Sequence, residues 1–137
     1  ALQFDYRDHV VNLVDTPGHS DFSEDTYRVL SAVDAAVMLV DAAKGLEPQT
    51  LKLFRVCAHR GIPVITVINK WDRPGLDALA LMDEITERTG LQPMPLTWAV
   101  GISGDFRGVW DLRNDRFARF QRPTGQRPVV KFLAPRE

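Results

Sequence analysis

A carboxylate, a glycine and a histidine follow one another in the segment 15–19, Asp-Thr-Pro-Gly-His, directly after the apolar run 10–14. The Asp15 carboxylate at the end of a strand can hold Mg²⁺ through a water molecule. Gly18 has no Cβ, so its backbone N–H can approach a phosphate closely. His19 would then lie where a water molecule that attacks the terminal phosphate must be oriented. The segment predicts a phosphate and magnesium site, although the same residue types also form ordinary tight turns.

A second polar segment, Asn69-Lys70-Trp71-Asp72, follows the apolar run 64–68. The Asp72 carboxylate can accept hydrogen bonds from both the ring N–H and the exocyclic amine of guanine, a pair of donors that adenine does not present. A site built on such bonds rejects the wrong base, because its own polar groups would be left unpaired. The stem of Lys70 can lie along the nucleotide, and Asn69 can tie neighbouring loops together. Two such segments, each after a buried strand, predict one guanine-nucleotide site.

Both segments together resemble the nucleotide-binding motifs of the translational GTPases. Residues 21–28, 41–45 and 95–101 are more similar to bacterial peptide chain release factors of the release factor 3 type than to elongation factor G. The resemblance extends over about residues 2–112. It implies a P-loop-NTPase-type GTPase domain with GTP or GDP and Mg²⁺ as cofactors.

By this resemblance the intact protein would be a cytoplasmic GTPase that acts on the ribosome and recycles release factors after translation termination. Its partners would be ribosomal RNA, ribosomal proteins and codon-reading release factors, with no membrane partner. His19 would be the catalytic residue, and Asp15 would hold Mg²⁺ through a water molecule. An elongation factor G-like translocase and a non-enzymatic GTPase remnant that serves as an interaction module are the alternatives. The predicted GTP-binding residues are Asp15, Thr16, Pro17, Gly18, His19, Asn69, Lys70, Trp71 and Asp72.

Apolar runs alternate with stretches of helical spacing, which predicts an α/β fold with a mostly parallel sheet and an antiparallel edge hairpin. Ligands of such sheets bind at the carboxyl ends of the strands, so both motifs are expected at one rim. Asp41, which follows a strand, is expected to be solvated or to cap a turn rather than to bind metal. The expected strands cover residues 2–6, 10–14, 35–40, 64–68 and 96–100, and the expected helices start near Asp21, Pro48 and Leu76, the last two ending at Gly61 and Gly90.

The chain contains no Gly-x-x-x-x-Gly-Lys-Ser/Thr sequence, so the loop that cradles phosphates in P-loop proteins is absent. The pattern is that of an internal piece of a larger protein. Residues 1–104 are expected to be a GTP-binding core without its P-loop strand, and residues 105–137 an insert, a subdomain or a poorly ordered tail. Without the P-loop strand, the strands that would lie beside it keep unpaired backbone N–H and C=O groups. Each such group costs about 1–3 kcal/mol if it is buried from water. The chain alone is therefore expected to be marginally stable, or to close its sheet differently, and not to hydrolyse GTP.

Length and composition fit one globular domain, with 137 residues of which 45% are hydrophobic and 26% charged. No apolar run approaches the roughly 20 residues that a membrane span requires. The single cysteine, Cys57, excludes an internal disulfide and is expected to be structural.

Positive charge concentrates in residues 105–137, where a hairpin is expected around Asn114. The arginine and aromatic residues there could stack on nucleic acid or belong to an insert, and the prolines after residue 122 disfavour compact structure.

Overall fold

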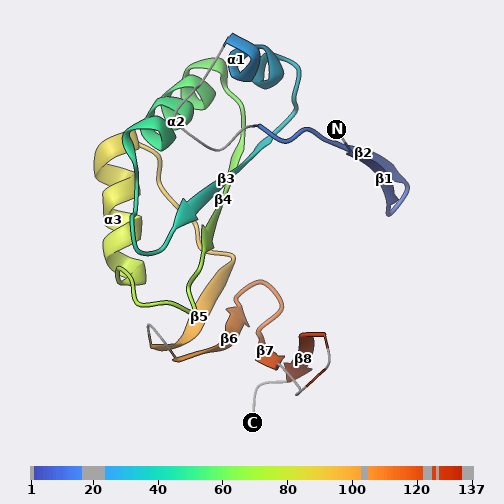
Figure 1. The fold of residues 1–137 in the computed structure, drawn as a ribbon, viewed down its shortest axis with the longest axis vertical. Coiled ribbons are helices and arrows are strands. Elements are labelled where there is room, and N and C mark those ends of the chain that lie inside the picture. The colour runs from blue at the N-terminus through green and yellow to red at the C-terminus, as the bar shows by residue number, and fades with distance from the viewer. Residues whose placement is uncertain (1, 17–23, 103–104, 122–124, 126, 134–137) are drawn as a thin grey trace.

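The computed structural model describes residues 2–16, 24–102, 105–121, 125 and 127–133 (Figure 1). The helices in these ranges are all too short or too polar to span a lipid bilayer. They are α1 (Glu24–Ser31), α2 (Pro48–Arg60) and α3 (Ala78–Thr89). The strands are β1 (Leu2–Tyr6), β2 (His9–Leu13), β3 (Ala36–Asp41), β4 (Val64–Asn69), β5 (Thr97–Ile102), β6 (Asp105–Asp111), β7 (Arg116–Gln121) and β8 (Val129–Leu133).

These strands form three sheets rather than one. The pair β1–β2 is antiparallel, the pair β3–β4 is parallel, and β5–β6–β7–β8 is an antiparallel sheet. The α/β class and the amino-terminal hairpin are as expected, but the expectation of a mostly parallel sheet holds only for β3 and β4. A parallel pair needs a crossover of about a dozen residues. Only residues 103–104 separate β5 from β6, so β5 pairs with β6 in the antiparallel direction instead.

The hairpin β1–β2 turns at Arg7 and Asp8, whose φ angles are 44° and 61°. Two successive residues with positive φ give a turn that matches the right-handed twist of the flanking strands. The register pairs Leu2 with Leu13 and Phe4 with Val11, and places these apolar side chains on one face. Figure 1 shows the hairpin projecting from the rest of the molecule.

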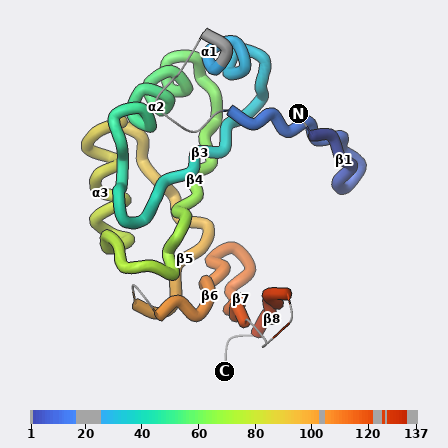
Figure 2. Tube along the Cα trace, in the orientation of Figure 1, coloured from blue at the N-terminus to red at the C-terminus, as the bar shows by residue number. Residues whose placement is uncertain are grey.

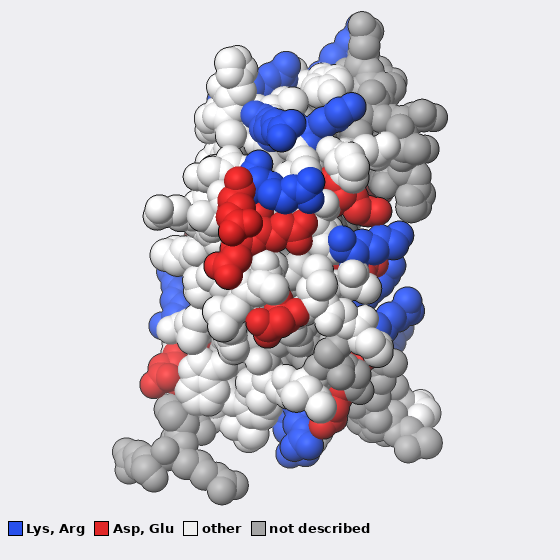
Figure 3. Space-filling model, turned by 90° about the vertical axis from the view of Figure 1, so that its left-hand side faces the viewer, with Lys and Arg blue, Asp and Glu red and all other residues white. Residues whose placement is uncertain are grey.

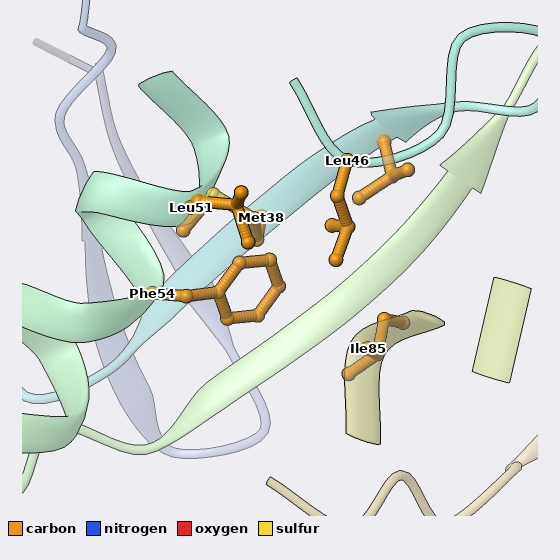
Figure 4. Packing of buried hydrophobic residues seen from close by; sticks show 6 residues of the cluster. Met38, Leu46, Leu51, Phe54 and Ile85 are labelled. Atoms are coloured by element: carbon orange, nitrogen blue, oxygen red, sulfur yellow. The ribbon is translucent and has the colours of Figure 1, made fainter. Parts of the chain in front are cut away.

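The main core lies where α2 and α3 cover one face of the β3–β4 pair (Figures 1 and 4). Helix α2 is the crossover that a parallel pair requires. In Figure 4 the ring of Phe54 lies at the centre of the cluster, and its side chain has no exposed surface. Cys57 is equally buried, which confirms its structural role, and burial raises the pKa of its thiol. The cluster consists of Met38, Val40, Leu46, Leu51, Phe54 and Ile85.

The other face of the β3–β4 pair is exposed. The side chains of Val37 and Leu39 keep 59% and 62% of their surface accessible, and Ile65 and Val67 on β4 are also exposed. The continuous apolar runs of β3 and β4 predict strands that are buried on both faces. Among the described residues, however, α2 and α3 cover the same face of the pair. Burial therefore alternates along β4.

The boundaries of the two longer helices follow their sequence signals. Helix α2 begins at Pro48 and is closed by Gly61 in the left-handed conformation, with φ 65°. Helix α3 is closed in the same way by Gly90, with φ 74°. Both expected ends are confirmed. The side of the molecule formed by α2 and α3 carries charges of both signs, as Figure 3 shows, which fits helices whose opposite faces pack on the sheet.

The carboxyl-terminal sheet extends further than expected. The predicted hairpin is confirmed as β6–β7, but β8 was not expected, because the prolines near it indicated little compact structure. Residues 129–133 lie between those prolines and pair with β7 in register. The Arg116 guanidinium stacks over the Phe132 ring at 4.0 Å, which ties β8 to its neighbour. The division into residues 1–104 and 105–137 remains a prediction.

Candidate functional site

The segment that carries the predicted guanine-reading residues is the turn after β4. Asn69 is the last residue of the strand, and the Arg73 backbone N–H donates to the Lys70 carbonyl at 3.1 Å to close the turn. Lys70 has a φ of 61° and redirects the chain away from the strand axis. Trp71 is half-buried, whereas Asp72 is exposed. The Asp72 carboxylate is thus accessible to solvent.

This turn is held by the loop that follows β3. Asp41 and Asn69 are partners in the parallel register, so the two strands end together. The Ala42 backbone N–H donates to the Asn69 carbonyl at 3.0 Å, and the Leu76 N–H donates to the Ala42 carbonyl at 2.8 Å. Backbone hydrogen bonds therefore tie the segment from Asn69 to Leu76, which includes this turn, to the loop after β3.

Lys70 makes an ion pair with Asp41. The Lys70 Nζ lies 3.0 Å from Asp41 Oδ2, while Asp41 Oδ1 accepts hydrogen bonds from the backbone N–H groups of Ala43 at 2.8 Å and Lys44 at 3.3 Å. The hydrogen bond from Lys70, followed by that from Ala43, lowers the pKa of Asp41 below its ordinary value. Asp41 caps its turn, as the sequence predicts. The ion pair was missed, although the position of Asp41 at a strand end was a usable signal.

Gly75 is a second residue that sequence reasoning overlooked. A Cβ at this position would lie 2.7 Å from the Ala42 carbonyl oxygen, so no larger residue fits without displacing backbone. We expect Gly75→Ala to lower the free energy of unfolding by about 1–3 kcal/mol through overpacking. Urea denaturation measures this change, with Lys52→Ala, at an exposed position of α2, as a control that stays within about 0.5 kcal/mol. Equal stability of both variants would contradict the close packing of the two loops.

The first predicted segment is described only in part. Asp15 is exposed and Thr16 half-buried, and both follow β2. Pro17, Gly18 and His19 lie outside the described residues, and their roles remain predictions. Among the described residues, no hydrogen bond or ion pair to the Asp15 carboxylate is found. A carboxylate at this position suits Mg²⁺, which takes one or two carboxylates together with substrate phosphates.

The structure does not bring the two predicted segments together. Figures 1 and 2 show the chain after β2 running at the level where β3 and β4 begin, whereas the turn with the predicted guanine-reading residues follows the far end of β4. The expectation of one shared rim is not met here. The physical reason is that the hairpin β1–β2 hydrogen-bonds only with itself, so no described strand aligns it with β3. The described residues also contain no cluster of three or more potential metal ligands.

Comparisons with known proteins give the family. The model of the elongation factor Tu GTP binding domain matches residues 1–132. Peptide chain release factor 3 of Microcystis aeruginosa (strain NIES-843 / IAM M-2473) is 60% identical over 122 residues, which are 89% of this chain and 22% of the relative. The proteins of the same name from Gloeothece citriformis (strain PCC 7424) and Acaryochloris marina (strain MBIC 11017) are 57% and 58% identical, over 89% and 95% of this chain. The chain covers 23% and 24% of those two relatives, so it spans only about a quarter of their length or less.

Proposed function

The chain belongs to the family of the elongation factor Tu GTP binding domain, and we propose that its turn after β4 reads the base of a guanine nucleotide. The observation that carries this proposal is the exposed Asp72 carboxylate on a turn whose ends are fixed by backbone hydrogen bonds. A turn whose backbone is already held in place presents its side chain to a ligand with little loss of backbone freedom on binding.

Each residue has a proposed role in this site. Asp72 accepts from the ring N–H and the exocyclic amine of guanine, while the stem of Lys70 lies along the nucleotide. Asn69 and Trp71 complete the turn. Bound Mg²⁺ would neutralise charge on the phosphates, and Asp15 would hold it through a water. Thr16, Pro17 and Gly18 would line the phosphates, and His19 would orient the attacking water.

The two segments need a further part of the domain to meet at one nucleotide. We propose that a P-loop strand outside these 137 residues packs beside β3 and aligns the β1–β2 hairpin with the parallel pair. The outer edge of β3, which pairs with no described strand, supports this proposal, because backbone groups at such an edge pair with a further strand in complete sheets. The exposed apolar faces of the β3–β4 pair and of the hairpin would be covered by other elements of the complete domain. The sheet would then be mostly parallel, with the hairpin at its edge.

For the whole protein we propose a cytoplasmic GTPase that acts on the ribosome and recycles codon-reading release factors after translation termination. The relatives that share 57–60% identity with most of this chain carry the name peptide chain release factor 3. A translocase of the elongation factor G kind is not favoured by those similarities. Ribosomal RNA and proteins would be the partners.

Nucleotide binding by the protein that carries this chain, at its natural length, tests the proposal. We expect GDP to bind at least about 10²-fold more tightly than ADP, because adenine leaves the polar groups of the site unpaired. Competition against a fluorescent guanine nucleotide measures this ratio. Equal affinities for GDP and ADP, or no binding of either, would refute the proposed function.

The 137 residues by themselves are expected to show no GTP hydrolysis, since the sequence lacks the phosphate-cradling loop and its lysine. Phosphate release from GTP measures this, with the His19→Ala variant of the same chain as the background. Turnover by the unmodified chain above that background would show that the P-loop is dispensable.

A further inference from the structure

We propose that Asp41 is a positioning residue for guanine-nucleotide binding, which acts by holding the Lys70 ammonium at the end of β4. The inference rests on the proposed function and extends it to a residue outside both predicted segments. Asp41 lies on a neighbouring strand, directly across the parallel register from Asn69.

The Asp41 carboxylate is the rigid partner of this pair. Its Oδ1 accepts from the backbone N–H groups of Ala43 and Lys44, at 2.8 and 3.3 Å, which fixes the orientation of the whole group. Its Oδ2 is thereby directed toward Lys70, 3.0 Å away. The Asp41 side chain is only 18% exposed, whereas that of Lys70 is 48% exposed. A fixed carboxylate thus selects one position for a side chain that would otherwise be mobile.

The backbone conformation of Lys70 determines where its side chain leaves the turn. Its backbone is in the left-handed region, with φ 61°, so its side chain leaves the turn in a direction that a regular strand would not give. A lysine in water populates many rotamers, and ordering it during binding reduces affinity. Asp41 orders Lys70 before the nucleotide arrives, so that cost is not incurred on binding.

A carboxylate that positions Lys70 and a carboxylate that restrains it away from the nucleotide predict opposite changes in GDP affinity. If Asp41 held Lys70 away from the nucleotide, binding would have to break the ion pair, and removing the Asp41 charge would strengthen binding. If Asp41 positions Lys70, removing that charge weakens binding. The sign of the change therefore decides between them.

The test is the GDP dissociation constant of the protein that carries this chain, at its natural length, with Asp41→Asn. Asparagine keeps an oxygen that can accept from Ala43 and Lys44 but loses the charge that attracts Lys70. We expect binding to weaken about two- to fivefold, the range of a partly exposed ion pair. Lys70→Met, which leaves the Asp41 turn intact, should weaken binding at least as much. Adding Asp41→Asn to Lys70→Met should cause no further loss.

Asp111 supplies a matched control. Its Oδ1 accepts from the backbone N–H groups of Arg113 and Asn114, each at 3.1 Å, and its Oδ2 pairs with Arg116 Nε at 3.2 Å. Asp111→Asn therefore removes a similar ion pair from a similar turn in another sheet. We expect it to leave GDP affinity unchanged.

The outcomes separate the inference from the proposed function. If the unmodified protein binds GDP and Asp41→Asn binds it equally or more tightly, the positioning role is overturned while the proposed function stands. Additive losses in the double variant would also overturn it, because Asp41 would then act through some other group. If the unmodified protein binds no GDP, both proposals fail.

Discussion

Replacing Asp72 with alanine is expected to weaken GDP binding by about 10²- to 10⁴-fold. The proposed site makes two hydrogen bonds from guanine to one ionised carboxylate, and hydrogen bonds to charged groups contribute about 1.5–3 kcal/mol each. Asp72 is exposed on a turn held at both ends, so its loss should not disturb the core. Competitive titration with a fluorescent guanine nucleotide measures the change.

Inosine diphosphate provides the internal control for this prediction, because it lacks only the exocyclic amine. The unmodified protein should prefer GDP over IDP by about 10- to 100-fold, the equivalent of one hydrogen bond to a charged acceptor. Asp72→Ala should abolish that preference, whereas Asp77→Ala, at a nearby exposed position, should preserve it. A preference for GDP that survives Asp72→Ala would show that another residue reads the base.

Replacing Phe54 with alanine is expected to lower the free energy of unfolding by about 3–5 kcal/mol. The Phe54 side chain is fully buried between α2 and the β3–β4 pair (Figure 4). Truncating it removes its contacts and leaves a cavity that the surrounding residues fill only in part. Since domains are stable by only about 5–15 kcal/mol, much of the folded population would be lost.

Urea denaturation followed by far-UV circular dichroism measures the effect of Phe54→Ala. Lys52→Ala is the matched control, because Lys52 is exposed on the same helix, and we expect it to stay within about 0.5 kcal/mol. A loss below about 1 kcal/mol for Phe54→Ala would mean that this cluster is not the core that stabilises the fold.

Most elements of the fold could be predicted from local sequence signals. The apolar runs locate β3 and β4, and Gly61 and Gly90 mark helix ends because each adopts a left-handed conformation there. Such signals depend on residues close in the chain, so they hold whatever the distant contacts are. The position of the segment 69–72 directly after a strand was predicted for the same reason.

The pairing of strands could not be predicted in this way. An apolar run such as 96–100 is compatible with parallel or antiparallel neighbours, and the short link between β5 and β6 decided the matter. The strand β8 is held by hydrogen bonds with β7, which ends at Gln121, and residues 129–133 by themselves do not indicate this pairing. The ion pair between Asp41 and Lys70 joins two loops that meet only because β3 and β4 end in register. Strand pairing and contacts between loops are set by tertiary structure, so local sequence patterns do not predict them.

The most direct measurement is a structure of the protein that carries this chain with GDP and Mg²⁺ bound. We predict that the Asp72 carboxylate will lie within hydrogen-bond distance of the guanine ring N–H and of its exocyclic amine, with Asp15 at the phosphate end of the same nucleotide. A base bound by other residues, or a bound nucleotide whose phosphates lie away from Asp15, would contradict the account.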